Sequence, residues 1–226
     1  MKDQSMQDIK NHQRVNDILL GPLERPALQF FARNMPAWIT PDKLTTLGLM
    51  GSVLIFVSYL LTRWNPAFLW LASLGFVINW FGDSLDGTLA RYRKIQRPIY
   101  GFFIDHSLDA ISETLVFIGL GLSPYVRLDL ALLALVGYLL MSVLVYIRTC
   151  VDGVFKISYG KLGPTEVRVL AIIANTVLFF SSNPQWNTSV GTFGVYDLFV
   201  IGVIILLYGF FLSTTAQEIR RLQHVD

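Results

Sequence analysis

The sequence predicts an all-α integral membrane protein with six transmembrane helices, preceded by an amphipathic helix that lies in the membrane interface. Three observations support this fold class. Of the 226 residues, 53% are hydrophobic and only 15% are charged, whereas soluble proteins carry about 25% charged residues. The hydrophobic residues occur in blocks of about twenty, the helix length that crosses a bilayer core. Basic residues are concentrated in every second connection between these blocks.

The six predicted spans are bounded by charged residues, proline or glycine. They cover residues 44–62, 67–90, 101–122, 128–150, 164–182 and 194–216. We therefore expect a cytoplasmic N-terminus with the interfacial helix at 1–43, a six-helix membrane domain at 44–216 and a cytoplasmic tail at 217–226. The first twenty residues lack the apolar core of a cleaved signal peptide, so insertion is expected to depend on the internal spans.

An amphipathic pattern precedes the first span, between Pro26 and Trp38. Starting at Leu28, apolar residues recur at positions i, i+3, i+4 and i+7, while charged residues fall on the other side of the helix. This pattern favours a helix that lies in the membrane interface. A helix packed on the protein's own cytoplasmic face fits the pattern equally well.

The lysine and arginine residues predict the orientation. If the N-terminus lies inside, the opposite loops contain only Arg63 and Arg127 of the 18 basic residues. Both termini and the loops near 91–101 and 151–163 are therefore expected in the cytoplasm. The net charge is only +2 and is spread over loops without a basic face, so nucleic-acid binding is not indicated.

Four aspartates interrupt the second and third spans. Asp83 and Asp86 are three residues apart and Asp105 and Asp109 are four apart, so each pair shares one helix face. On insertion scales four unpaired aspartates would cost on the order of 10 kcal/mol. Something must therefore offset their charge. An alternative to a bound cation is pairing, in a solvated vestibule, with the nearby basic residues Arg91, Arg93, Lys94 and Arg97.

A metal site explains the aspartates better than isolated ion pairs. Carboxylate ligands select Mg²⁺, Mn²⁺ or Ca²⁺ over Zn²⁺, and the single cysteine, Cys150, excludes both a disulfide framework and a cysteine-based site. Small residues on the same stripes, at Gly87, Ala90 and Gly101, are expected to let the two acidic faces approach closely. Two ions about 4 Å apart would then bind a diphosphate and stabilise charge as a phosphoryl bond breaks.

These residues form a pattern that resembles the signature of the CDP-alcohol phosphotransferase family. The chain reads D-x-x-D-G-x-x-A-R from Asp83 to Arg91 and, after nine residues, G-x-x-x-D-x-x-x-D from Gly101 to Asp109. All eight signature residues are present. Similarity extends over about residues 41–170 and includes Pro41-Asp42-Lys43-Leu44-Thr45 at the start of the first span, with Asp42 where the family usually has Asn.

The resemblance implies an enzyme and a role for each signature residue. Such enzymes have six membrane helices, are usually dimeric, and transfer a substituted phosphate from a CDP-linked donor to an alcohol with release of CMP. Asp83, Asp86 and Asp105 would bind Mg²⁺ or Mn²⁺, and Asp109 would be a further ligand or the base that activates the acceptor hydroxyl. The site of the CDP-linked donor would be formed by Gly87, Ala90, Arg91 and Gly101.

Two residues bear on the subclass, His106 and Glu166. The segment Phe-Ile-Asp-His-x-x-Asp from Phe103 and the segment Thr165-Glu166-Val167 resemble segments of choline and ethanolamine phosphotransferases. In that branch the His and the Glu are implicated in activating the diacylglycerol hydroxyl, so the resemblance favours CDP-choline or CDP-ethanolamine as donor and diacylglycerol as acceptor. In the simpler interpretations, His106 is hydrogen-bonded to the next helix and Glu166 complements a helix dipole.

Other functions remain open at this stage. A CDP-diacylglycerol donor with a polar acceptor, such as glycerol phosphate, serine or inositol phosphate, would use a basic cluster for an anionic acceptor, namely Arg148, Lys156, Lys161 and Arg168. A cation-coupled transporter would need a polar path to the opposite face, whereas residues beyond Phe117 and before Asn79 are mainly apolar. A catalytically silent scaffold is a third option, against which the intact signature argues.

Four further polar residues in or beside the spans have structural interpretations. Asn79 and Asn175 are expected to form hydrogen bonds between helices, and Asp197 is expected to cap a helix start. Glu113 lies one turn beyond Asp109 and either extends the acidic site or pairs with a basic residue.

Overall fold

The computed structural model describes residues 13–15, 19–152, 154–156, 163–181, 183–189 and 191–223. In these residues the protein is all-α apart from two short strand pairs. The helices are α2 (Gly21–Asn34), α3 (Pro41–Leu61), α4 (Phe68–Tyr92), α5 (Pro98–Leu122), α6 (Leu128–Asp152), α7 (Pro164–Phe180) and α8 (Val195–Leu222). Strand β1 (Gln13–Val15) pairs in parallel with β2 (Val154–Lys156), and β3 (Gln185–Thr188) pairs antiparallel with β4 (Gly191–Gly194).

Four helices in the described part of the chain are long and apolar enough to cross a membrane: α3, α4, α6 and α8. Helix α5 has the length but carries Asp105, Asp109 and Glu113, and α7 has only 17 residues. The all-α membrane fold is therefore confirmed, while six crossings and the orientation of the termini stay predictions. Residues 1–12, the loop residues 157–162 with Lys161, and the tail residues 224–226 lie outside the described residues.

Proline marks the start of several helices. Helix α3 begins at Pro41, after Thr40, whose side-chain oxygen accepts a hydrogen bond from the Lys43 N–H (3.4 Å). Helices α5 and α7 begin at Pro98 and Pro164. Proline suits the first helical turn because the N–H groups there have no partner within the helix. These starts fall at, or up to three residues before, the starts predicted from the sequence.

Helix α2 begins five residues earlier than the predicted interfacial helix and ends at Asn34. It ends there because Met35 precedes Pro36 and takes an extended conformation. On its inner face, Leu28 and Ala32 are buried against residues of α3 and α4, namely Leu44, Leu85 and Leu89. One face of α2 thus packs on the protein itself, as the second interpretation of its pattern holds, and its place in the membrane interface stays a prediction.

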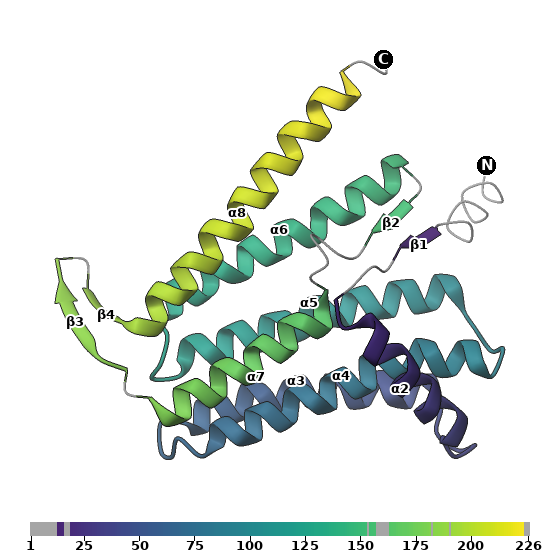
Figure 1. Cartoon of the computed structure of the whole chain (residues 1–226), viewed down its shortest axis with the longest axis horizontal. Coiled ribbons are helices and arrows are strands. Elements are labelled where there is room, and N and C mark those ends of the chain that lie inside the picture. Colours follow the sequence, from purple (N-terminus) through teal and green to yellow (C-terminus); the bar gives the residue numbers. More distant parts are fainter. Residues whose placement is uncertain are drawn as a thin grey trace.

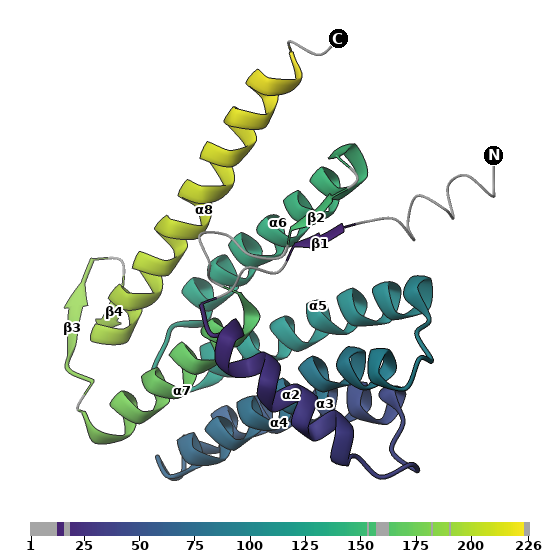
Figure 2. The same ribbon diagram turned by 45° about the vertical axis from the view of Figure 1, so that its right-hand side comes forward.

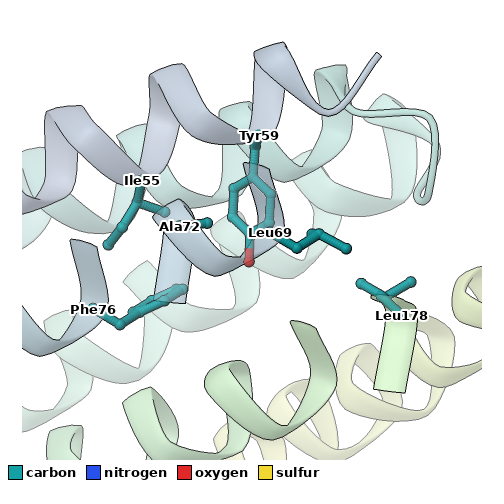
Figure 3. Packing of buried hydrophobic residues seen from close by; sticks show 6 residues of the cluster. All are labelled: Ile55, Tyr59, Leu69, Ala72, Phe76 and Leu178. Atoms are coloured by element: carbon teal, nitrogen blue, oxygen red, sulfur yellow. The ribbon is translucent and has the colours of Figure 1, made fainter. Parts of the chain in front are cut away.

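Helices α3, α4 and α7 share a buried core. Figure 3 shows this cluster, formed by Ile55, Tyr59, Leu69, Ala72, Phe76 and Leu178. The Tyr59 hydroxyl donates a hydrogen bond to Oδ1 of Asn175 (2.9 Å), and the Asn175 amide donates to Oγ of Ser73 (3.2 Å). The expected interhelical role of Asn175 is therefore confirmed.

Glycines bring α3 and α4 into close contact. A Cβ atom on Gly82 would lie 2.3 Å from the backbone nitrogen of Gly48, and one on Gly51 would lie 2.6 Å from that of Asn79. Helix α3 also packs against α5. The small residues that bring the helices together are thus on α3 and in the middle of α4. Gly87, Ala90 and Gly101, which were expected to do so, line a cleft instead.

Helices α6 and α8 form a second group. They pack against each other, and α6 also packs against α5. In Figures 1 and 2 both lean away from the other helices, and the C-terminal half of α8 stands clear of them. Only 11% of the most apolar stretch of α8 is buried, a degree of exposure suited to contact with lipid.

The β3–β4 hairpin lies at the end of the bundle opposite the α4–α5 connection (Figure 1). It leads into α8, whose start is capped as the sequence predicts. The Asp197 carboxylate accepts hydrogen bonds from the N–H groups of Gly194 (2.7 Å) and Arg127 (2.8 Å). The cap therefore also fixes the loop between α5 and α6.

Candidate functional site

A cleft of about 330 Å³ lies where the start of α3, the end of α4 and the start of α5 meet. Asp86 and Asp105 line it, together with Gly87, Ala90 and Gly101. A Cβ atom on Gly101 would meet no atom within 4 Å. The helix backbone at Gly101 is therefore open to the cleft. Of the four predicted donor-site residues, Gly87, Ala90 and Gly101 line this space and Arg91 is not among its lining residues, so the donor site stays a prediction.

A smaller pocket contains the other two aspartates. Asp83 and Asp109 line it with Asp105, which also lines the larger cleft, as does Thr45. Two adjoining spaces thus bring together side chains from α3, α4 and α5. The spacing of the aspartates predicted convergence of α4 and α5, and the structure adds α3 as the third wall.

Asp86 is buried and held by two donors. The Thr45 hydroxyl donates to its Oδ2 (2.6 Å), and the Gly87 N–H donates to its Oδ1. These bonds fix the carboxylate at the wall of the cleft. The sequence assigned no role to Thr45, although it ends the Pro41–Thr45 segment that resembles the family.

Asp83 forms an ion pair with a residue of α7. Nη2 of Arg168 lies 2.6 Å from Oδ2 of Asp83, and Nε of Arg168 donates to Oδ1 of Asn79 (2.7 Å). The Asn79 amide in turn donates to the Gly48 carbonyl (3.0 Å) and to Oγ of Ser52 (2.9 Å). The interhelical role of Asn79 is therefore confirmed, and Arg168 pairs with an aspartate that the sequence assigned to a metal.

The basic residues after α4 contact other groups. Arg97 pairs with Asp42 and stacks over the Tyr100 ring, 4.1 Å from its centroid. Arg93 donates to the carbonyl oxygens of Met35 (2.9 Å), Pro36 (2.8 Å) and Ile39 (2.5 Å). Arg91 donates to Oγ1 of Thr88 (3.1 Å). The contacts of Arg93 and Arg97 hold the α3 start in place, so these two residues do not form the alternative pairing with the aspartates of α4 and α5.

His106 lies on α5 beside Asp109. Its Nδ1 is 3.8 Å from Oδ2 of Asp109, which is longer than a hydrogen bond. The edge of the ring meets Phe102 at 4.3 Å between centroids, and Tyr146 of α6 lies at 5.2 Å. The imidazole is therefore oriented by aromatic neighbours and needs only a small movement to reach the carboxylate.

Glu166 is buried at the start of α7. Its Oε1 accepts a hydrogen bond from the Leu20 N–H (2.7 Å) and its Oε2 accepts one from the Gly163 N–H (2.9 Å). This is the geometry of a helix cap, so it matches the simpler interpretation of Glu166. A catalytic pair with His106 stays a prediction.

The predicted basic cluster is divided between two places. Arg168 lies at Asp83, whereas Arg148 of α6 pairs with Glu218 of α8 at 2.9 Å. Glu218 also accepts from Nε of Arg221 (2.8 Å). Arg148 and Arg168 are thus each neutralised locally by a carboxylate, which weakens the idea of one anionic acceptor site formed by both.

Among the described residues, no group of three or more His, Cys, Asp or Glu side chains is arranged to hold a metal ion. In both Asp83 and Asp86, Oδ2 is bonded to a protein side chain, Arg168 and Thr45 respectively. The donor set itself suits a hard cation. The metal ligands therefore stay a prediction.

Comparison with known proteins decides the family. A family model described as CDP-alcohol phosphatidyltransferase matches residues 38–214. The chain belongs to the CDP-alcohol phosphatidyltransferase family. The matched region of this CDP-alcohol phosphatidyltransferase-family protein extends from the α2–α3 connection into α8, and so includes every wall of the cleft.

Relatives of this family member have several names. It is 30% identical to cholinephosphotransferase 1 of Bos taurus over 167 residues. This matched region covers 69% of the chain and 40% of the relative. It is 32% identical over 105 residues to archaetidylinositol phosphate synthase of Pyrococcus horikoshii, which covers 46% of the chain and 52% of the relative. Phosphatidylinositol phosphate synthase of Cutibacterium acnes is 37% identical over 87 residues, 38% of the chain and 39% of the relative. The chain spans about half the length of the relatives it matches.

Proposed function

We propose that the chain is a divalent-metal-dependent CDP-alcohol phosphotransferase of phospholipid synthesis, active at the cytoplasmic face of a membrane. It transfers a substituted phosphate from a CDP-linked donor to an alcohol hydroxyl and releases CMP. One observation carries the proposal. Asp86 and Asp105 share a cleft with Gly87, Ala90 and Gly101, and these are the residues that the signature assigns to the metal and the donor.

In this proposal two Mg²⁺ or Mn²⁺ ions are held by Asp83, Asp86, Asp105 and Asp109. The donor set fits, because the residues that line the two adjoining pockets include these four carboxylates and neither histidine nor cysteine. When bound, the ions would stabilise the negative charge that develops on the diphosphate as its internal phosphorus–oxygen bond breaks and CMP leaves.

The residues of the chain supply binding and proton transfer. Gly87, Ala90 and Gly101 leave room for the nucleotide against the helix backbone, and Arg91 donates to phosphate oxygens. Asp109 takes the proton of the acceptor hydroxyl, either directly or through His106. The hydroxyl oxygen then forms its bond to the phosphorus that carries the transferred group, and CMP leaves with the electrons of the broken phosphorus–oxygen bond.

The leading substrates are CDP-choline or CDP-ethanolamine with diacylglycerol. The Phe103–Asp109 segment and the similarity to a cholinephosphotransferase over 69% of the chain support them. A CDP-diacylglycerol donor with a polar alcohol acceptor is the second candidate, supported by the two inositol phosphate synthases among the relatives. We further propose six membrane crossings, cytoplasmic termini and a homodimer. A cation-coupled transporter is disfavoured by the apolar residues on the far side of the cleft.

The test follows CMP production by the purified full chain in lipid with Mg²⁺ or Mn²⁺. One arm supplies CDP-choline or CDP-ethanolamine with diacylglycerol, and the other supplies CDP-diacylglycerol with polar alcohols. Turnover in one arm alone identifies the donor, and silence in both contradicts the proposal. Asp86→Asn and Asp105→Asn should abolish turnover in a folded protein. Asp129→Asn is the matched control, because Asp129 is exposed and pairs with Arg127 (2.6 Å) away from the cleft.

A further inference from the structure

Arg168 stands at the junction of α3, α4 and α7, beside the smaller pocket. Its guanidinium is forked: Nη2 reaches Oδ2 of Asp83 at 2.6 Å and Nε reaches Oδ1 of Asn79 at 2.7 Å. The side chain is only 13% exposed. A guanidinium presents its donors in one rigid plane, so two simultaneous bonds fix the direction of both acceptors.

The Asn79 side chain, which accepts the hydrogen bond from Nε of Arg168, is held in place by contacts that do not involve Asp83. Asn79 is buried and its amide donates both to the Gly48 carbonyl and to Oγ of Ser52, so α3 fixes its orientation. Arg168 itself belongs to α7. The carboxylate of Asp83 is therefore aligned by groups from α3 and α7 as well as by its own helix.

We infer that Arg168 is a positioning residue, which fixes the direction of the Asp83 carboxylate at the pocket that Asp83 shares with Asp105 and Asp109. With Oδ2 bonded to Arg168, Oδ1 of Asp83 is the oxygen that meets a cation. The inference rests on the proposed metal site. It extends that proposal because Arg168 lies outside the signature and the sequence placed it in a cluster for an anionic acceptor.

Replacement by lysine separates geometry from charge. Arg168→Lys keeps a positive charge, but an ammonium on a flexible stem cannot reproduce the planar fork to Asn79 and Asp83. Partners that orient metal ligands typically affect metal affinity by 10- to 100-fold. We expect the Mn²⁺ dissociation constant of Arg168→Lys to rise by about tenfold or more. The Mn²⁺ concentration for half-maximal CMP release should rise in parallel, with turnover largely restored at saturating Mn²⁺.

The experiment titrates Mn²⁺ into the purified full chain in lipid and measures free Mn²⁺ by electron paramagnetic resonance. Arg168→Lys and Arg168→Gln are compared with Asp83→Asn and with the matched control Arg148→Lys, whose guanidinium pairs with Glu218 on other helices. Thermal unfolding of each variant verifies the fold. If Arg168→Gln fails to fold, the Mn²⁺ affinity of Arg168→Lys alone tests the positioning role. The control Arg148→Lys should bind Mn²⁺ with the same dissociation constant as the unaltered chain.

Weaker Mn²⁺ binding by Arg168→Lys and by Asp83→Asn supports the inference. Equal or tighter binding by Arg168→Lys, with weaker binding by Asp83→Asn, overturns the positioning role and leaves the metal site standing. If the unaltered chain binds no Mn²⁺, or Asp83→Asn binds it unchanged, the metal site at Asp83 fails and the inference fails with it.

Discussion

Gly82→Ala tests the close approach of α3 and α4 that underlies the site. The added Cβ would lie 2.3 Å from the Gly48 nitrogen and 2.5 Å from the Leu44 carbonyl oxygen. An ordinary carbon contact needs at least 3.4 Å, and both neighbours are backbone atoms of α3. The two helices must therefore move apart by about 1 Å, which loses a quarter to a half of the dispersion energy of the contacts between them.

The expected loss of stability follows from two opposing effects. Overpacking against backbone costs about 3 kcal/mol, the upper end of the usual range, and replacing glycine by alanine in a helix returns about 1 kcal/mol. The net loss of about 2 kcal/mol lowers the melting temperature by about 4–8 °C for a chain of this size. The displacement also moves Asp83, the next residue, so metal-dependent activity should fall with it.

The assay is thermal unfolding of purified protein in detergent, followed by tryptophan fluorescence. Gly202→Ala is the matched control, because a Cβ on this glycine of α8 would meet no atom within 4 Å. The control should melt at the same temperature as the unaltered chain or a few degrees higher. A melting temperature of Gly82→Ala equal to or above that of Gly202→Ala would refute the packing argument.

Three further substitutions test the cleft and the cap formed by Glu166. Thr45→Val removes the 2.6 Å hydrogen bond to the buried Asp86 carboxylate, so stability should fall by about 1–3 kcal/mol and CMP release should fall with it; Thr45→Ser should recover most of both. Glu166→Gln leaves one of two backbone N–H groups without an acceptor, so stability should fall by about 1–3 kcal/mol; lost turnover without a lower melting temperature would indicate catalysis instead. Gly101→Ala enters open space in the cleft, so the KM for the CDP-linked donor should rise while the melting temperature holds, and an unchanged KM would contradict the donor site.

The sequence predicts the helices well because their signals are local. Hydrophobic length and bounding prolines place the start of each span within three residues of the observed helix, as at Pro41 and Pro98. The spacing of the aspartates also predicts which helix faces carry the site. Each of these inferences needs only the periodicity of a single helix.

The partners of the aspartates could not be predicted in this way. Arg168 and Asp83 are 85 residues apart, and Thr45 and Asp86 are 41 apart. Each contact depends on which helices pack together, and that in turn depends on glycines such as Gly82, whose place on an interface has no signature in the hydrophobic pattern. The sequence offered only the basic residues near α4 as alternative partners for the aspartates, whereas Arg97 contacts the α3 start.

The ion pair between Arg168 and Asp83 also constrains the order in which the protein can be completed. Asp83 is synthesised 85 residues before its partner. At about 5–20 residues per second, α4 waits about 4 to 17 seconds for the arrival of α7. During that interval the Asp83 carboxylate lacks its Arg168 partner, and an unpaired charge in lipid is costly. This ion pair beside the smaller pocket is therefore made only after α5 and α6 have been synthesised, so completion of the site is a late event in the biogenesis of this protein.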